Sequence, residues 1–413
     1  MSELDLNSEH AAALLERVKS AYGASLANAV LLFDRLFALR SAWAPGLFFV
    51  GGEIDPQLGS HERFSLAGAS DSIEGAFAAC LGEGIERVSQ LEHDGDIVER
   101  RPIGEICSEN YNWLKSLLDD LKVDASATVD WVAGTLLGTH RSILIPADWC
   151  LRRVRPGLLH MRDTALSTGC AAGTTVEAAA VRAILELIER DAAALWWKGG
   201  RRARPLAADG CAMTSAVRLL DKLRQGERHR ITWILNITSD VGIPVAAALS
   251  VDPSGFGLVC GLAARFTLQE AACAAVLELV QIELGLQLTM VKRHQRGDGA
   301  LNSIDRRRLA LASRINAESC DLLHPLGKPD IEKPDSSSSE DAQRLARLAA
   351  ALAGVGVEVA TVNLMRSQFK VPVVKALAPT LQLYPRKIKT ARLLSAIAET
   401  GGGERWSQGL DIL

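Results

Sequence analysis

Three segments of the chain share one pattern of apolar and acidic positions. They read AACLGEGIER at residues 78–87, VRAILELIER at 181–190 and CAAVLELVQI at 273–282. Their apolar residues recur at helical spacing, so each segment predicts a helix with a buried face. Copies separated by roughly 100 residues are too far apart for a solenoid repeat. The pattern therefore predicts internal pseudo-symmetry within one domain.

The alignment of these segments also superposes their polar residues. The aligned positions hold Glu83, Glu186 and Glu278 and, three residues later, Glu86, Glu189 and Gln281. Each segment follows a signal for a helix start, in which a capping residue precedes a glutamate by three positions. The three pairs are Asp71 with Glu74, Thr174 with Glu177, and Thr267 with Glu270. We expect the three helices to begin in the same way.

The rest of the chain alternates between predicted helices and strands. Residues 8–39 are rich in Ala, Leu, Glu and Arg at helical spacing and predict one or two helices. Residues 342–353 predict another helix, and residues 357–364 and 371–379 have the composition of strands. The sequence thus predicts an α/β chain of the mixed α+β kind, with helices packed on mixed sheets.

One polar run interrupts this pattern. The sequence KPDIEKPDSSSSE, at residues 328–340, contains two prolines and four consecutive serines. It predicts an exposed loop over about residues 326–341 rather than a linker between domains. We therefore expect an N-terminal helical segment over residues 1–40 and one domain over residues 41–413.

The composition is that of a soluble globular protein. Of the 413 residues, 48% are hydrophobic and 23% are charged, which provides enough apolar material for a large core. The net charge of −3 gives no global attraction to nucleic acid. The first ten residues are polar and acidic, unlike a secretory signal, and the apolar stretch 241–264 is interrupted by Asp252 and Pro253. We expect no nucleic-acid partner and no membrane span.

The cysteines indicate a reducing compartment. None of the eight forms a CxxC pair, and none lies at the spacing of zinc ligands. Reduced thiols are typical of the cytosol, so we expect a cytoplasmic protein.

The acidic pairs are the strongest candidates for chemistry. Residues three apart lie on one face of a helix, so Glu83 projects with Glu86, and Glu186 with Glu189. Apolar residues surround both pairs, and partly buried carboxylates need cations. Four carboxylates on two packed helices would suit Mg²⁺, which prefers oxygen ligands and often bridges nucleotide phosphates. Salt bridges to the adjacent Arg87 and Arg190 explain any single pair equally well, but the repetition favours the metal.

The segment before the second helix adds a candidate phosphate site. It reads STGCAAGTT over residues 167–175, and its glycines and hydroxyls precede a capped helix start. Backbone N–H groups at such a place can bind phosphate oxygens. The chain has no GxxxxGK[ST], HExxH or GxSxG motif, which excludes an ordinary P-loop and two common hydrolase sites.

Taken together, these motifs resemble the YcaO superfamily. The stretch 167–197, with ELIERD followed by a tryptophan pair, is similar to the signature of that family. Further matches are AGASDSIEGAFAACLGEGIERVS at 67–89, the ExxQ helix with Glu278 and Gln281, GIPV at 242–245 and VPVVKALAPTL at 371–381. The resemblance covers most of the chain from about residue 40 onward.

The resemblance implies a YcaO-type fold that binds ATP and Mg²⁺ between pseudo-symmetric halves. It implies that the Mg²⁺ ligands are Glu83, Glu86, Glu186 and Glu189. It implies that the residues contacting the nucleotide are Ser70, Thr174, Glu177, Arg190, Arg265 and Gln281.

Family members activate a peptide-bond oxygen with ATP. The resemblance therefore implies a cyclodehydratase that converts Cys, Ser or Thr of a ribosomally made precursor peptide to azolines, and the segment 131–149 favours this branch. One alternative is a thioamide-forming member that works with a TfuA-like partner. Another is a catalytically silent protein that binds a peptide or partner, which Ala79 and Glu283, as departures from the family pattern, would favour.

The resemblance also implies partners. The short segment before residue 40 leaves little room for a peptide-binding domain. We therefore expect a leader-peptide-binding partner protein, with a flavin-dependent dehydrogenase as a further candidate and a homodimer within a hetero-complex as the expected assembly.

Overall fold

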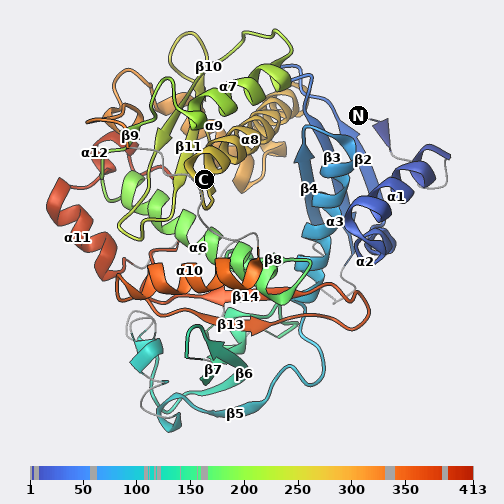
Figure 1. Ribbon diagram of the computed structural model, residues 1–413, viewed down its shortest axis with the longest axis vertical. Coiled ribbons are helices and arrows are strands. Elements are labelled where there is room, and N and C mark those ends of the chain that lie inside the picture. The colour runs from blue at the N-terminus through green and yellow to red at the C-terminus, as the bar shows by residue number, and fades with distance from the viewer. Residues whose placement is uncertain are drawn as a thin grey trace.

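The computed structural model contains helices packed against three sheets (Figure 1). It describes residues 2–3, 9–55, 63–106, 110, 112–115, 118, 122–139, 141–155, 157–159, 166–330, 340–383 and 389–412. The predicted mixed α+β fold with helices on sheets is confirmed. Within the described residues the ladders between named strands are antiparallel, rather than a mixture of parallel and antiparallel pairs.

The first sheet comes from the N-terminal part of the chain. Its order is β1 (Ser2–Glu3), β2 (Arg35–Leu39), β3 (Phe48–Ile54) and β4 (Phe64–Ser70). Helices α1 (Glu9–Tyr22) and α2 (Ala24–Asn28) confirm most of the helix predicted over residues 8–39. The prediction is wrong for residues 35–39, because this segment pairs along its whole length with β3. Helix α3 (Ile73–Ser89) packs along β4.

The second sheet has the order β12 (Val259–Ala264), β11 (Val245–Val251), β10 (Ile231–Asn236) and β9 (Arg204–Pro205). Every residue of β11 and β12 is buried. Helix α7 (Cys211–Arg224) packs on α8 (Leu268–Arg296), which lies along β11 and β12. By length and composition α8 is long and apolar enough to cross a membrane, but half of its most apolar window is buried against the protein, as in the core helix of a water-soluble fold.

The third sheet combines strands from the middle of the chain with two strands near its C-terminal end. Its order is β5 (Glu99–Pro102), β6 (Thr128–Leu136), β13 (Ala360–Asn363), β14 (Val373–Leu377) and β8 (Cys170–Ala172), and β7 (Ser142–Pro146) also pairs with β6. Helix α6 (Val176–Trp197) packs on β14 and β8, and α10 (Asp341–Ala353) packs on α6. The strands and helix predicted near the C-terminus are therefore confirmed.

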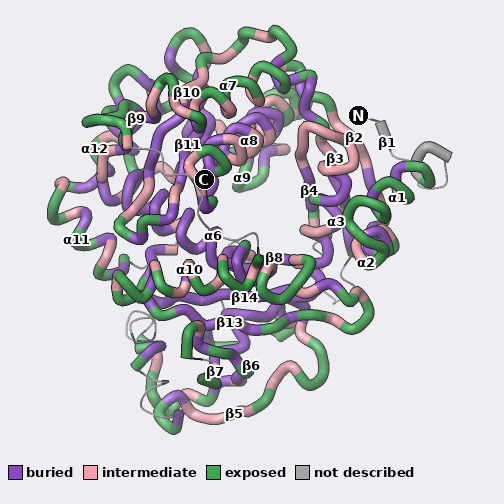
Figure 2. The backbone as a smooth tube through the Cα atoms, viewed as in Figure 1, coloured by how far each residue is buried: buried purple, intermediate pink, exposed green. Residues whose placement is uncertain are grey.

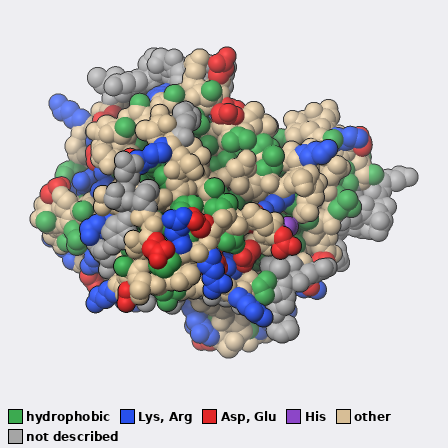
Figure 3. Space-filling view, turned by 90° about the horizontal axis from the view of Figure 1, so that it is seen from below, with side chains coloured by type: hydrophobic (Ala, Val, Ile, Leu, Met, Phe, Trp, Pro, Cys, Tyr) green, Lys and Arg blue, Asp and Glu red, His purple; other side chains and the backbone are tan. Residues whose placement is uncertain are grey.

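The remaining segments complete the outline. Helices α9 (Ser303–Arg314), α11 (Ala391–Thr400) and α12 (Glu404–Ser407) lie in the C-terminal part of the chain. Of the predicted loop at 326–341, residues 326–330 have no regular secondary structure, and residues 331–339 lie outside the described residues. On the face shown in Figure 3, acidic and basic side chains are interspersed with polar and apolar ones.

The predicted internal repeat consists of three strand–turn–helix units, β4–α3, β8–α6 and β12–α8. The N-caps are Ser72, Thr175 and Thr267, each eleven residues before the first glutamate of its helix. Each hydroxyl accepts a hydrogen bond from the backbone N–H three residues later, at 3.2, 2.9 and 3.1 Å. The caps predicted at Asp71 and Thr174 are wrong by one position, since the neighbouring hydroxyl caps the helix instead, and the cap at Thr267 is confirmed.

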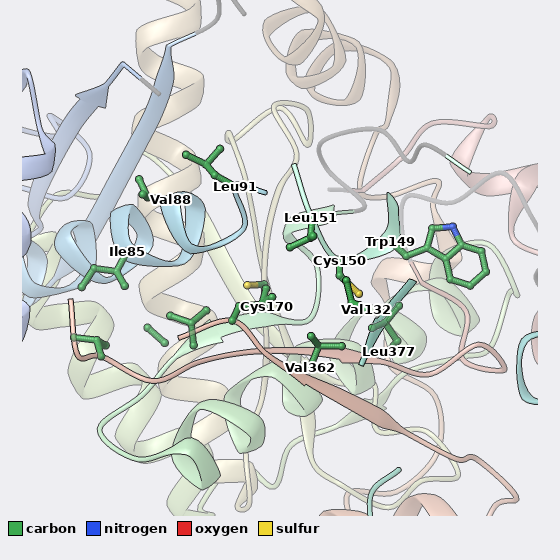
Figure 4. Close-up of a cluster of buried hydrophobic side chains, with 14 of the residues drawn as sticks. Ile85, Val88, Leu91, Val132, Trp149, Cys150, Leu151, Cys170, Val362 and Leu377 are labelled. Atoms are coloured by element: carbon green, nitrogen blue, oxygen red, sulfur yellow. The ribbon is translucent and has the colours of Figure 1, made fainter. Parts of the chain in front are cut away.

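The helices of the three units pack into different hydrophobic clusters, α3 into one, most of α6 into a second and α8 into a third. Figure 2 shows buried backbone running through α6 and through β11 and β14. In the cluster of Figure 4, Cys170 lies between Ile85 and Val88 of α3 and the segment that carries Cys150 and Leu151. The helices that carry the acidic pairs therefore pack into the core on their apolar faces, and α3 and α6 approach each other through β8, on which both pack.

Candidate functional site

Three of the predicted carboxylates line one cavity. Glu83 and Glu86 from α3 and Glu186 from α6 border a space of about 250 Å³. Its other lining residues are Arg87, Gln90, Ser167 and Cys170. The structure thus brings together side chains that are about 100 residues apart in the sequence.

The first glutamate of each repeat is held by its own strand. The backbone N–H of Ala67 donates to Glu83 at 2.8 Å, that of Gly169 donates to Glu186 at 3.0 Å, and that of Leu262 donates to Glu278 at 2.6 Å. A charged acceptor makes these hydrogen bonds stronger than neutral ones. The repeat therefore fixes the orientation of each carboxylate from the backbone.

Glu86 joins two of the units. Its carboxylate accepts a hydrogen bond of 2.8 Å from the N–H of Ala172, in β8 of the next unit. The carboxylates of α3 and the strand before α6 are therefore fixed relative to each other.

A second group of charged side chains lies next to Glu186. It comes from α6, from α8 and from the turn before α8. Arg190 donates from Nη2 to Glu186 at 3.3 Å, and its Nη1 lies 3.4 Å from a carboxylate oxygen of Glu189. Glu189 and Glu278 also interact electrostatically with each other and with Arg265. Arg265 is exposed and donates to the carbonyl of Ala264.

Burial makes these carboxylates hard to ionise. Desolvation raises the pKa of Glu86 to about 8, because the N–H of Ala172 only partly offsets it and the neighbouring acids oppose ionisation. Desolvation also raises the pKa of Glu189 to about 8, against the favourable charge of Arg190. The pKa values of Glu83 and Glu278 are raised for the same reason. Such a set of acids lacks positive charge, which a bound divalent cation would supply.

The alternative of structural salt bridges explains part of the arrangement. Arg190 pairs with both Glu186 and Glu189, and Arg87 lies 3.9 Å from Glu83. One guanidinium shared by two buried carboxylates leaves an excess of acid. Within the described residues no three acidic, His or Cys side chains already converge as ligands of one ion. Mg²⁺ bound between a protein and phosphates commonly takes only one or two carboxylates, so the donor set fits that ion.

The other predicted contacts are placed at the helix starts and on α8. Ser70 is at the end of β4, where its hydroxyl donates to Asp71 at 3.4 Å. Thr174 and Glu177 are exposed at the beginning of α6, and Gln281 is half-buried on α8. They do not line the 250 Å³ cavity, so their contact with a nucleotide stays a prediction.

Sequence reasoning missed several residues of the cavity. Gln90 lies seven residues after Glu83 and therefore on the same helix face, a signal that was available. Cys170 is buried, and desolvation raises the pKa of its thiol, so it is a packed residue of the cavity wall. Trp196 and Trp197 are core residues outside the cavity, and their indole N–H groups donate to the carbonyls of Leu322 and Leu410.

Glu283 does not belong to this site. It is fully buried and accepts two hydrogen bonds from Arg224, at 2.6 and 2.7 Å, and one of 2.5 Å from Ser250. Arg230 lies 3.2 Å away. Glu283, the residue that departs from the family pattern, thus forms a structural ion pair that links α8 to α7 and to the second sheet.

Glu283→Gln should destabilise the fold without changing the site. Removal of this charge leaves two buried guanidinium groups uncompensated, which we expect to lower the free energy of unfolding by about 3–5 kcal/mol. Urea denaturation measures the change, with Glu227→Gln as control, because Glu227 is only half-buried. A loss of nucleotide affinity with normal stability would instead place Glu283 in the site.

The raised pKa values predict opposite pH responses with and without ligand. A folded-state pKa of about 8 for Glu86, against an ordinary value of 4.5, gives stability that is complete below about pH 4.5 and lost as the pH rises through about 8. The melting temperature of the ligand-free protein should therefore fall across this range, while the stabilisation by Mg²⁺ with a nonhydrolysable ATP analogue should increase. Thermal denaturation between pH 6 and 9 measures both. Ligand stabilisation that is independent of pH would contradict the assignment.

These features define a class of protein. Glutamates from two helices that border one cavity are the kind of ligand that Mg²⁺ takes between a protein and the phosphates of a nucleotide. The chain belongs to the family described as YcaO cyclodehydratase, ATP- and Mg²⁺-binding, whose model matches residues 67–382. The predicted family and the cofactors ATP and Mg²⁺ are thereby confirmed at the level of the family.

Solved structures share the fold. A heterocyclase in complex with substrate and cofactor matches with a TM-score of 0.73 and 22% identity, over 94% of this chain and 55% of that one. YcaO from Methanopyrus kandleri, bound with AMPPCP and Mg²⁺, matches with a TM-score of 0.63 and 19% identity, over 89% and 91% of the chains. The E. coli microcin synthetase McbBCD complex with pro-MccB17 bound matches with a TM-score of 0.64 and 16% identity, over 84% and 88%.

The coverage differs among these structures. The chain spans about half the length of the heterocyclase in complex with substrate and cofactor, and about half that of the heterocyclase TruD. In a comparison with curated protein sequences, nothing matches this chain.

Proposed function

We propose that this protein uses ATP and Mg²⁺ to activate backbone amides of a ribosomally synthesised precursor peptide, and that it converts Cys, Ser or Thr residues to azolines. The observation that carries the proposal is the convergence of Glu83, Glu86 and Glu186 on one cavity in a chain of this family. The raised pKa values of the buried carboxylates support a site built to receive cations.

Each charged residue has a proposed role. Glu83, Glu86, Glu186 and Glu189 hold Mg²⁺, and Arg190 keeps Glu186 and Glu189 in place from one side. Arg190 also faces the phosphates. The remaining nucleotide contacts are assigned to Ser70, Thr174, Glu177, Arg265 and Gln281, which lie at the helix starts and on the neighbouring unit.

In the proposed reaction the protein positions the nucleotide and the peptide, and it need not form a covalent bond with either. When bound, Mg²⁺–ATP supplies a phosphoryl group to the amide oxygen, which departs as phosphate. The substrate's own thiol or hydroxyl attacks the preceding carbonyl carbon, so the protein need not provide a nucleophile. The side chains around the cavity orient the phosphates and compensate charge.

Partner proteins are part of the proposal. We propose that a leader-peptide-binding protein delivers the precursor, that a flavin-dependent dehydrogenase can act after ring formation, and that the chain forms a homodimer within the complex. The structural match to a synthetase complex with a pro-peptide bound supports a partner-dependent enzyme.

The test is a reaction with candidate precursors. The purified protein is incubated with ATP, Mg²⁺, the proteins encoded beside it and small peptides encoded nearby, with reactions lacking ATP as controls. Mass spectrometry should find the loss of one water per modified residue. An exchange of oxygen for sulfur would establish the thioamide alternative, and peptide binding without ATP turnover would establish a silent binding protein; either result overturns the azoline proposal.

A further inference from the structure

A buried lysine, Lys375, pairs in the third sheet with Cys170, which lines the acidic cavity. Lys375 lies in β14, where all five residues are buried, and only 2% of it is exposed. An ammonium group in such a place destabilises the fold unless polar atoms replace its water. Desolvation accordingly lowers the pKa of Lys375. The position of this lysine requires an explanation beyond packing.

Two hydrogen bonds of Lys375 reach one segment of the chain. Its Nζ donates to the carbonyl of Leu166 at 2.8 Å and to that of Thr168 at 2.5 Å. The carbonyl of Leu166 also accepts a hydrogen bond of 2.6 Å from Nε2 of Gln90, which caps the C-terminal end of α3. The lysine therefore ties β14 to the segment before β8 and, through a shared acceptor, to the helix that carries Glu83 and Glu86.

The same segment supports the carboxylates. The N–H of Gly169 donates to Glu186, and that of Ala172 donates to Glu86. Ser167 and Cys170 from this segment line the cavity. The path of residues 166–172 thus determines where two of the carboxylates point.

The position of this segment is sensitive to change, because its backbone lies very close to the backbone of β14. Gly169 has a φ of +75°, and a Cβ atom at this residue would lie 2.7 Å from the carbonyl oxygen of Ala376. The N–H of Ala376 in turn donates to the carbonyl of Gly169 at 2.7 Å. The segment is held against β14 by this hydrogen bond and by the neighbouring Lys375, so loss of the lysine releases one side of a tightly fitted turn.

We propose that Lys375 is a positioning residue for the Mg²⁺–nucleotide site, because it anchors residues 166–168 so that the N–H groups of Gly169 and Ala172 aim Glu186 and Glu86 into the cavity. The inference rests on the proposed function. Lys375 does not itself line the cavity, so its effect passes through the carboxylates. Its charge also interacts favourably with Glu186, which reinforces the same arrangement.

The experiment compares Lys375→Met with Val362→Ala. Methionine keeps the length of the side chain but removes the charge and the donors. The control shortens the buried residue of β13 that pairs directly with Lys375, and its apolar side chain makes none of the hydrogen bonds to residues 166–168. It therefore separates a local loss of packing and stability from the loss of these hydrogen bonds. Calorimetry measures the binding of the nonhydrolysable analogue AMPPCP as a function of Mg²⁺ concentration, and urea denaturation measures stability.

Lys375→Met should raise the Mg²⁺ concentration needed for half-maximal binding by about 10- to 100-fold, as expected for a residue that orients metal ligands. Val362→Ala should leave this concentration unchanged even where its stability falls. If Lys375→Met does not fold, Gln90→Leu removes the other donor to Leu166 and should shift the Mg²⁺ dependence in the same direction.

The outcomes separate this inference from the proposed function. A wild-type protein that binds no Mg²⁺–AMPPCP overturns the proposed function. A wild-type protein that binds it, together with a Lys375→Met variant that has the same Mg²⁺ dependence, overturns only the role of Lys375. If Lys375→Met does not fold, an unchanged Mg²⁺ dependence in Gln90→Leu overturns it as well.

Discussion

Glu186→Gln should abolish most of the ATP turnover of this protein while leaving it folded. Glu186 lies between the two acidic groups, since it borders the cavity with Glu83 and Glu86 and shares Arg190 with Glu189. An amide keeps the shape and can still accept the N–H of Gly169, but it removes the charge that would face the cations. We expect kcat for ATP hydrolysis with substrate peptide to fall by a factor on the order of 10²–10³, as for the loss of one preorganised electrostatic contact.

Glu74→Gln is the matched control for this variant. Glu74 is also a helix glutamate paired with an arginine, at 2.7 Å from Arg17, but it lies in the first turn of α3 and does not line the cavity. Its neutralisation should leave turnover unchanged and stability within about 0.5 kcal/mol. Full activity of Glu186→Gln would exclude this carboxylate from the site, and equal losses in both variants would point to a nonspecific effect.

Glu86→Gln should make the ligand-free protein more stable and at the same time unable to bind Mg²⁺–nucleotide tightly. At neutral pH a buried glutamate whose pKa is about 8 must either take up a proton on folding or remain charged away from water, and both cost free energy. Glutamine avoids both costs and can still accept the N–H of Ala172. We expect a gain of about 1–3 kcal/mol in the free energy of unfolding, the pattern of a site in which stability is sacrificed for function.

Urea denaturation at neutral pH, with and without Mg²⁺–AMPPCP, measures both effects. The wild type should gain stability from the ligand, and Glu86→Gln should gain far less. A structural role for Glu86 makes the opposite prediction, because its neutralisation would then destabilise the ligand-free fold. The sign of the change therefore distinguishes a binding carboxylate from a salt bridge.

The convergence of the acidic side chains could be predicted from the sequence, because helix periodicity and the internal repeat both apply to them. Residues three apart share a helix face, and three copies of one helix pattern implied units that pack in an equivalent way. The combination places Glu83, Glu86 and Glu186 on one cavity, as the structure shows. The family resemblance of residues 167–197 implies the same glutamates as metal ligands, and that role stays a prediction.

Other features depend on tertiary contacts that no local pattern contains. Residues 35–39 have the composition of a helix but form a strand, because the edge of β3 satisfies their backbone groups. Lys375 gives no sequence signal for burial, since its partners are carbonyl groups about 200 residues earlier. Glu283 looked like a defect in the site until its partners on α7 and in the second sheet were known.

The exact position of a helix start could not be predicted from the local sequence. Asp71 and Ser72 are both good N-caps by type, as are Thr174 and Thr175. The choice between neighbours is made by where the preceding strand ends and the helix can pack, and both helices begin at the later residue. The chemistry of the cap was therefore predictable, and its position was not.

The central claim is that carboxylates of α3 and α6 bind divalent cations together with ATP. Crystals grown with Mn²⁺ in place of Mg²⁺ and with AMPPCP test it directly, because anomalous scattering locates manganese without ambiguity. The account predicts manganese beside Glu83, Glu86, Glu186 and Glu189, with the phosphates of the analogue completing the coordination. Nucleotide bound elsewhere, or manganese absent from these carboxylates, would contradict it.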